Sequence, residues 1–137
     1  FASDGEEMVH LFNKWVNIFE DPQTTEYYKN LRDVSSAAII ASALYELTWY
    51  TDNKMYKEKA DKMIESLSKE PYRAEVGTNG GFIFKHSVGS LPHSILNLQA
   101  GKTTAHNIDV PLNYADYYFL EALLRKGRVE KGENPIK

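Results

Sequence analysis

The fold is decided by the stretch Asp33-Val34-Ser35-Ser36-Ala37-Ala38-Ile39-Ile40-Ala41-Ser42-Ala43-Leu44-Tyr45-Glu46-Leu47. Nearly every position after Ser36 is apolar or small, and alanine and leucine are among the strongest helix formers. Asp33 and the two serines after it supply N-cap signals at the start of this run. A helix that is apolar on almost every side is buried by its neighbours. The stretch therefore predicts a helix at the centre of an all-α domain.

Helical periodicity continues on both sides of this stretch. Apolar residues recur at spacings of three and four from Asp4 to Phe19, and again from Lys54 to Ser68, where charged residues fill the other face. Asn113 to Arg125 predicts a further helix, which Gly127 is expected to end, and the charged tail Lys126 to Lys137 is expected to fray. Apolar helices thus alternate with amphipathic ones, as in helical hairpins stacked with one helix inside and one outside. No heptad seam or fixed-period repeat favours a coiled coil or a repeat array.

Two segments lack helical periodicity. Asn79-Gly80-Gly81 lies between Glu75-Val76 and Phe82-Ile83-Phe84, which predicts a tight turn between two short extended segments and a little β-like structure near residues 75–85. His86 to Pro111 is interrupted by glycine and proline and predicts a long loop. Loops of that length in compact domains are usually functional or disordered.

The composition excludes several classes of protein. With 42% apolar and 26% charged residues in 137, the chain has the composition of a globular domain. No apolar run approaches the roughly 18 residues of a membrane helix, so no membrane partner is expected. The net charge of −3 and the spread of 16 Lys and Arg disfavour a nucleic-acid partner, and the absence of cysteine excludes a disulfide scaffold and a thiolate zinc site. Because the chain begins with Phe1 instead of Met, we expect it to derive from a longer polypeptide.

Three separated motifs carry a resemblance to a known family. They are Arg32-Asp33-Val34-Ser35-Ser36-Ala37-Ala38-Ile39 with its continuation to Leu47, Lys85-His86-Ser87-Val88-Gly89, and Ile108-Asp109-Val110-Pro111 with the helix Tyr114 to Arg125. In this order they cover most of Arg32 to Arg125. Together they resemble the C-terminal part of the unsaturated glucuronyl hydrolases, glycoside hydrolase family 88.

The resemblance implies an (α/α)6 barrel, in which six helical hairpins surround a pocket lined by the inner helices. Twelve helices of about 12 residues joined by loops of about six need at least roughly 200 residues. Residues 1–137 are therefore expected to form about the last third of one such domain. Its partners would be the missing N-terminal part of the barrel or, through the face of the inner helices, a second copy of the chain.

The resemblance also implies an activity. The family adds water across the C4=C5 double bond of an unsaturated uronyl residue at the non-reducing end of an oligosaccharide left by a polysaccharide lyase. The family's catalytic aspartates belong to the N-terminal part of the fold, so this chain is expected to hold no catalytic residue and no cofactor, and to be inactive alone. The alternative is an independent all-α carbohydrate-binding or interaction module without chemistry.

Four residues are expected to contact the saccharide: His86, Ser87, Ser90 and Tyr114. In some members of the family, a serine, a second serine three residues on and a lysine two further bind sulfate or hydroxyl groups, which suit hydroxyl and ammonium donors. Here Pro92 stands where that lysine would be, and this departure leaves the sulfate preference open. Serines in loops are also common turn formers.

Two carboxylates lie near the expected inner helices. Asp33 could be mistaken for a catalytic acid, but the order Asp-x-Ser-Ser favours an N-cap whose carboxylate accepts backbone N–H groups. Asp116 lies inside the last helix, where we expect it to hydrogen-bond an adjacent inner helix.

The histidines are candidate metal ligands, and the tyrosines are candidate stacking faces for sugar rings. His10, His86, His93 and His106 contain no pair at helical spacing of four, so no metal site is expected. Most aromatic residues are expected in the core, whereas Tyr27, Tyr28 and Tyr114 lie next to loops or helix starts and are candidates for stacking on sugar rings.

Overall fold

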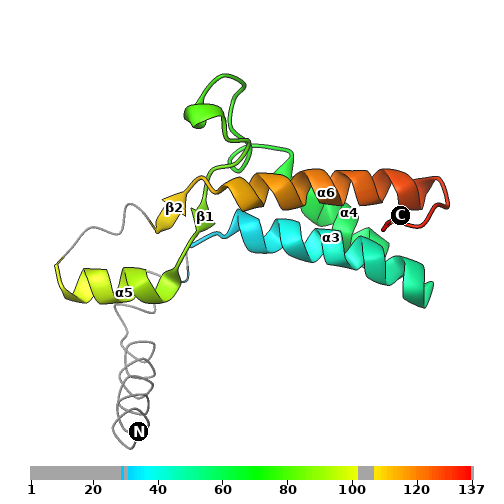
Figure 1. The fold of residues 1–137 in the computed structure, drawn as a ribbon, viewed down its shortest axis with the longest axis horizontal. Helices are drawn as coiled ribbons and strands as arrows, with labels where there is room; N and C mark the ends of the chain where they lie inside the picture. Colours follow the sequence, from blue (N-terminus) through cyan, green and yellow to red (C-terminus); the bar gives the residue numbers. More distant parts are fainter. Residues whose placement is uncertain (1–28, 30, 102–106, 137) are drawn as a thin grey trace, which may run out of the picture.

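A computed structural model describes residues 29, 31–101 and 107–136 (Figure 1). The predicted helix from Asp4 to Phe19, the candidate stacking residues Tyr27 and Tyr28, and the histidines His10 and His106 lie outside the described residues. Of the residues described, most are helical: α3 spans Val34–Thr51, α4 Lys54–Leu67, α5 Leu91–Gln99 and α6 Asn113–Glu130. The strands β1, Ser87–Val88, and β2, Ile108–Val110, form a small antiparallel sheet, and a 3-10 turn spans Asn79–Gly81.

Helices α3 and α4 form a hairpin because two adjacent residues end one helix and begin the next. Asp52 adopts the left-handed conformation (φ 51°) that commonly ends helices, and its N–H donates to the carbonyl of Thr48. The side chain of Asn53 then accepts a hydrogen bond from the N–H of Met55 at 3.0 Å and caps α4. The predicted helix Lys54 to Ser68 is thereby confirmed, with Ala60, Ile64 and Leu67 buried on one stripe.

Helix α6 runs parallel to α3 and packs against it. Their starts, cyan and orange in Figure 1, lie at the same end, beside the small sheet. Four alanines, Ala38 and Ala41 on α3 and Ala115 and Ala122 on α6, are fully buried. Small side chains at these positions are consistent with close approach of the two helices. Phe119 on α6 packs edge-to-face on Phe84, with ring centroids 4.7 Å apart.

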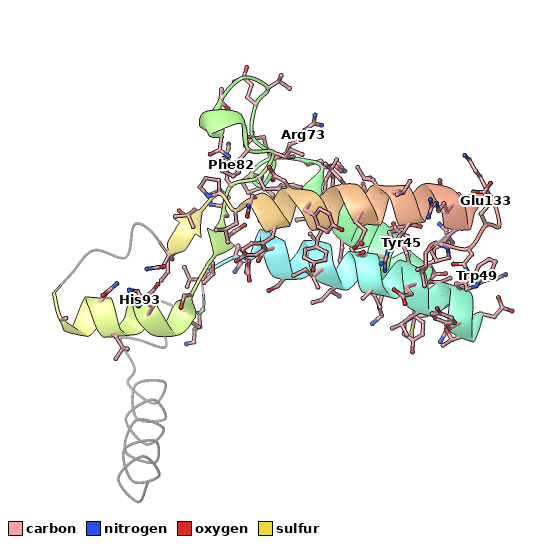
Figure 2. The ribbon with its side chains drawn as sticks, viewed as in Figure 1. Tyr45, Trp49, Arg73, Phe82, His93 and Glu133 are labelled. Carbon is pink, nitrogen blue, oxygen red and sulfur yellow. The ribbon has the colours of Figure 1, made fainter. Side chains whose placement is uncertain are left out.

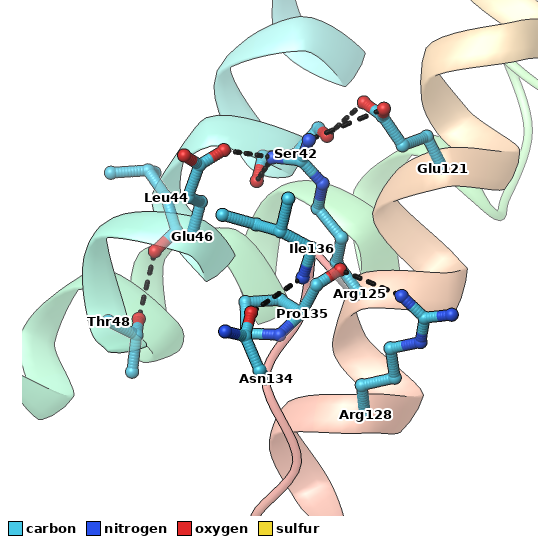
Figure 3. A network of polar contacts seen from close by, with 10 residues as sticks. All are labelled: Ser42, Leu44, Glu46, Thr48, Glu121, Arg125, Arg128, Asn134, Pro135 and Ile136. Atoms are coloured by element: carbon cyan, nitrogen blue, oxygen red, sulfur yellow. Dashed lines mark hydrogen bonds and ion pairs between the residues drawn. The ribbon is translucent and has the colours of Figure 1, made fainter. Parts of the chain in front are cut away.

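A polar network joins the middles of α3 and α6 (Figure 3). Arg125 donates to the carbonyl of Ser42 at 3.2 Å, to Glu46 at 2.7 Å and to Glu121 at 3.3 Å, and the hydroxyl of Ser42 donates to Glu121 at 2.5 Å. Because residue numbers rise together along both helices in these pairs, the network confirms that α3 and α6 are parallel. Beyond it, Arg128 donates to the carbonyl of Pro135, which holds the chain after α6 against the helices.

One side of the α3–α6 pair is apolar and open to solvent. Its large side chains are Ile39, Ile40, Leu47 and Tyr50 on α3 and Tyr114, Tyr117, Leu120, Leu123 and Leu124 on α6. The sequence predicts α3 to be buried on all sides, and this holds only for the side facing α4 and α6. Among the described helices, none is long and apolar enough to cross a membrane.

The segment from His86 to Pro111 is more structured than the loop predicted for it. It contains β1, α5 and β2. The loop prediction, which rests on Gly89, Pro92 and Gly101, is wrong because proline is well tolerated in the first turn of a helix and the two glycines lie outside α5. The hydroxyl of Ser90 accepts a hydrogen bond from the N–H of His93, and its carbonyl accepts one from the N–H of Ser94. Ser90 therefore caps the start of α5.

The predicted turn near residues 75–85 is present, with its pairing shifted. Asn79–Gly81 forms the turn, but the backbone pairs are Ala74 N–H to Ile83 and Lys85 N–H to Tyr72 instead of a ladder through Glu75 and Val76. The paired strands of the chain lie elsewhere, at β1 and β2.

The end of α6 also differs from the prediction. Gly127 does not end the helix, which continues to Glu130, and the tail does not fray, since Pro135 is buried. The helix continues because Lys126 and Val129, on either side of the glycine, have tertiary partners that outweigh the low helix propensity of glycine.

Candidate functional site

Asp33 joins the start of α3 to the small sheet. Its carboxylate accepts the N–H of Ser35 at 3.0 Å, the hydroxyls of Ser35 and Ser36 at 2.6 Å each, and the N–H of Val88 in β1 at 3.3 Å. Burial alone would raise the pKa of Asp33, but these hydrogen bonds outweigh burial and hold the pKa below its usual value of 3.8. The predicted N-cap is confirmed, and the carboxylate is ionised at neutral pH.

Asp116 holds the loop that precedes β1. From the first turn of α6 it accepts the N–H groups of Ile83 at 2.9 Å and Phe84 at 3.2 Å. The expected partner, an adjacent inner helix, was wrong: both partners belong to the loop between α4 and β1. With Asp33, this carboxylate fixes residues 83–88 across the N-terminal ends of α3 and α6.

The fixed segment carries two of the predicted saccharide contacts. His86 is half-buried, and its carbonyl accepts the N–H of Val34 at 3.2 Å. Ser87 is fully buried, with 0% of its surface exposed, and its hydroxyl has no hydrogen-bond partner among residues 29, 31–101 and 107–136. Ser87 therefore lies beneath the surface while His86 reaches it.

The other two predicted contacts lie on neighbouring helices. Ser90 is half-buried at the start of α5. His93, which is labelled in Figure 2, is exposed on the same helix. Tyr114 is exposed in the first turn of α6. The structure thus places all four residues on elements that adjoin the small sheet, at the end where α3 and α6 begin.

Asp109 also lies in this region, although it is not among the four contacts expected from the sequence. Its Oδ1 lies 2.5 Å from Nδ1 of His86, across the β1–β2 pair. Both residues have positive φ, 64° for His86 and 58° for Asp109. Only the preference of aspartate for such backbone could have pointed to it from the sequence.

Two hollows open in the same region. One has a volume of about 260 Å³ beside the start of α6, where Figure 2 labels Phe82; it is lined by Gly80, Gly81, Phe82, Asn113 and Asp116. The other, of about 160 Å³, lies between the start of α3 and the end of α4; it is lined by Arg32, Asp33, Val34, Ala37, Met63, Ser66, Leu67 and Tyr72. Neither hollow brings together a group of carboxylates and histidines: over residues 29, 31–101 and 107–136, no three such side chains lie close enough to hold a metal ion.

Comparison with known proteins gives a single consistent relationship. No protein-family model matches the sequence. The chain is 42% identical over 108 residues to the unsaturated glucuronyl hydrolase of Formosa agariphila, a match that covers 79% of this chain and 24% of that protein. It also superposes on a crystal structure described as an unsaturated glucuronyl hydrolase specific for heparin, with a TM-score of 0.61, 42% identity, and coverage of 76% of this chain and 25% of the other.

The chain spans about a quarter of the length of these two relatives. Sequence and fold agree over the same share of the chain, so the resemblance carried by the three motifs is confirmed. In sequence and in fold, the chain is related to the unsaturated glucuronyl hydrolases.

Proposed function

We propose that residues 1–137 form the C-terminal part of an (α/α)6-barrel unsaturated glucuronyl hydrolase, one segment of a single catalytic domain. The observation that carries the proposal is 42% identity to two unsaturated glucuronyl hydrolases, one of them matched also in fold. The arrangement of helices supports it: α3 and α6 lie parallel, as inner helices would, and α4 packs on α3 as its outer partner (Figure 1).

The open apolar side of α3 and α6 supports the same proposal. Soluble monomers seldom leave apolar patches of more than several hundred Å² uncovered. In an (α/α)6 barrel, each inner helix is covered by its outer partner, by two neighbouring inner helices and by the substrate pocket. The remainder of the barrel, which precedes this segment in the proposed enzyme, would cover the exposed isoleucines, leucines and tyrosines of α3 and α6.

The reaction we propose is hydration of the C4=C5 double bond of an unsaturated uronyl residue. A carboxylic acid protonates C4 and leaves an oxocarbenium-like centre, water adds at C5, and the hemiketal opens and releases the neighbouring sugar. Neither Asp33 nor Asp116 is placed to be this acid, because Asp33 is an ionised helix cap and Asp116 accepts two backbone N–H groups, and we propose that the acid lies in the part of the enzyme that precedes this segment.

The role that remains for this chain is to bind the saccharide. His86, Ser90 and Tyr114 lie at or near the surface around the starts of α3, α5 and α6. Imidazole and hydroxyl groups hydrogen-bond sugar hydroxyls, and an exposed tyrosine ring offers a stacking face. Ser87 lies beneath this surface, because its hydroxyl is buried.

The test is an assay of the complete enzyme that contains this chain, with an unsaturated uronyl disaccharide as substrate. The conjugated double bond absorbs ultraviolet light, so hydration releases the neighbouring sugar and removes the absorbance together. Release of the sugar with unchanged absorbance would mean ordinary glycoside hydrolysis, and no release would contradict the proposal. A disaccharide with a saturated uronic acid is the control, and it should remain intact.

A further inference from the structure

The pair formed by His86 and Asp109 has features that a simple surface ion pair does not need. His86 immediately precedes β1, and Asp109 is the central residue of β2. Both adopt left-handed backbone, which is uncommon for residues other than glycine and costs free energy unless the surroundings impose it. Such backbone clusters at functional sites, where it aims a side chain in a direction that regular strands would not allow.

The surroundings hold the backbone of both residues. The carbonyl of His86 accepts the first N–H of α3, and the buried Ser87 and Ile108 anchor the strands next to His86 and Asp109. The pairing of Ser87 with Val110 and of Val88 with Ile108 leaves an irregularity between the two residues of β1. The pairing of the two strands therefore places His86 and Asp109 opposite each other.

The contact fixes the tautomer of the neutral imidazole. A carboxylate only accepts hydrogen bonds, so the 2.5 Å contact to Asp109 requires the proton of the neutral ring to be on Nδ1. The ring of Tyr72 stands edge-on to the imidazole, with centroids 6.4 Å apart and an interplanar angle of 86°. Within the described part of the chain, Nε2 of His86 has no hydrogen-bond partner, and 34% of the side chain is exposed.

We infer that Asp109 is a positioning residue, which holds the proton of His86 on Nδ1 so that Nε2 accepts a hydrogen bond from a hydroxyl group of the bound saccharide. This inference rests on the proposed function for the presence of a saccharide. The inference goes beyond the proposed function because it assigns a role to Asp109 and names the atom of His86 that contacts the ligand.

The first test reads the tautomer in the 137-residue chain and needs no activity. Nitrogen-15 shifts of the histidine rings distinguish a proton on Nδ1 from a proton on Nε2, and His86→Asn assigns the His86 signals by their loss. The unmodified chain should show the Nδ1–H form. Asp109→Asn keeps the size of the side chain and tolerates positive φ, but its amide can donate to the ring, so the Nε2–H form should appear.

The second test is kinetic and uses the complete enzyme. Asp109→Asn should raise KM about fivefold, the effect of one lost neutral hydrogen bond, with kcat little changed. His86→Asn should do the same, because its amide still reaches Asp109 while Nε2 is absent. The double variant should be no worse than either single variant, since Asp109 acts only through His86. The control is Asp52→Asn, an aspartate with φ 51° at the far end of α3, which should change nothing.

The outcomes separate the two proposals. If the unmodified enzyme hydrates its substrate but Asp109→Asn leaves KM unchanged, or if the two substitutions add, the inference is wrong and the pair only ties β1 to β2. If the tautomer of His86 does not respond to Asp109→Asn, the inference is also wrong. Failure of the unmodified enzyme to act on any unsaturated uronide would refute the proposed function, while the tautomer would still report on Asp109.

Discussion

Asp61 is the residue on which three helices converge. Its carboxylate accepts the hydroxyl of Tyr45 on α3 at 2.8 Å, the ammonium of Lys57 on α4 at 2.6 Å and that of Lys126 on α6 at 2.5 Å. Burial alone would raise the pKa of Asp61, but the hydrogen bonds from Lys126, Lys57 and Tyr45 outweigh it and lower the pKa to about 2 from 3.8. Burial and the neighbouring Asp61 raise the pKa of Tyr45.

This lowered pKa predicts how stability depends on pH. A carboxylate with a lower pKa in the folded state stabilises it fully above the unfolded pKa, and that contribution is lost as the pH falls from about 4 towards 2. Asp61→Asn should therefore cost about 1–2 kcal/mol near pH 7, discounted for partial exposure, and much less near pH 2. Urea unfolding at the two pH values measures the difference. Glu65→Gln, in an exposed pair with Lys69, is the control without measurable effect.

Ser87 and Ser94 form a matched pair for a second prediction. Both are buried, but the hydroxyl of Ser94 donates to the carbonyl of Ser90 at 2.8 Å, whereas that of Ser87 has no partner in the part of the chain that the structure describes. Removing a satisfied buried hydroxyl costs about 1 kcal/mol, and removing an unsatisfied one costs nothing or stabilises. Ser94→Ala should thus lower the free energy of unfolding by about 1 kcal/mol and Ser87→Ala should not. Equal losses in both variants would show that the Ser87 hydroxyl has a bonded partner.

Residue roles were predictable from the sequence where the partners are local. The cap formed by Asp33 was evident because Ser35 and Ser36 follow it directly. Asp116 was placed correctly on its helix but given the wrong partner, because its bonds reach back 33 and 32 residues to Ile83 and Phe84. The pairing of His86 with Asp109 spans 23 residues and depends on the fold of a segment predicted as a loop.

Among elements, α3 and α6 are joined most tightly at Arg125. Its guanidinium is mostly buried between Glu46 and Glu121 (Figure 3). Arg125→Ala would leave two carboxylates facing each other without a cation, at a cost of about 2–3 kcal/mol. Arg128→Ala, on the same helix, removes one hydrogen bond to Pro135 and should cost about 1 kcal/mol or less. Thermal unfolding of the two variants decides this, and equal effects would contradict the assigned network.

Long helices were the elements that the sequence predicted well. Helix propensity and periodicity placed α3, α4 and the start of α6 because these signals are repeated over many residues. Helix α5 was missed because its nine residues begin at a Ser-Leu-Pro sequence that also starts loops. The end of α6 was missed because tertiary contacts of Lys126 and Val129 carry the helix past a glycine, and no local signal reports them.

For the whole molecule, the open apolar side of α3 and α6 predicts self-association of the isolated chain. Light scattering should show species larger than a monomer, and a hydrophobic dye should bind. Leu120→Lys, in the middle of this side, should weaken both signals. Val76→Lys is the matched control, since Val76 is 88% exposed on a loop away from these helices. A stable monomer that binds no dye would show that the chain closes its own core.

The proposed (α/α)6 barrel needs the rest of the enzyme, because about three quarters of each relative has no counterpart in this chain. The sequence predicts a helix that is apolar on nearly every side, and that pattern does not tell which side of α3 is open. In an incomplete barrel, Ile39, Ile40, Ala43, Leu44 and Leu47 are expected to lose their cover. Leu44 is half-buried, whereas the other four are exposed.

We propose that this chain is the saccharide-binding segment of an unsaturated glucuronyl hydrolase and that the catalytic acid lies in the rest of the enzyme. The most direct measurement is the ultraviolet absorbance of an unsaturated uronyl disaccharide over time, with the purified 137-residue chain in one sample and the complete enzyme in the other. We expect loss of absorbance with the complete enzyme and none with the chain alone. Loss of absorbance with the chain alone, at a rate comparable to that of the complete enzyme, would contradict it and would make Asp33 and Asp116 candidate acids.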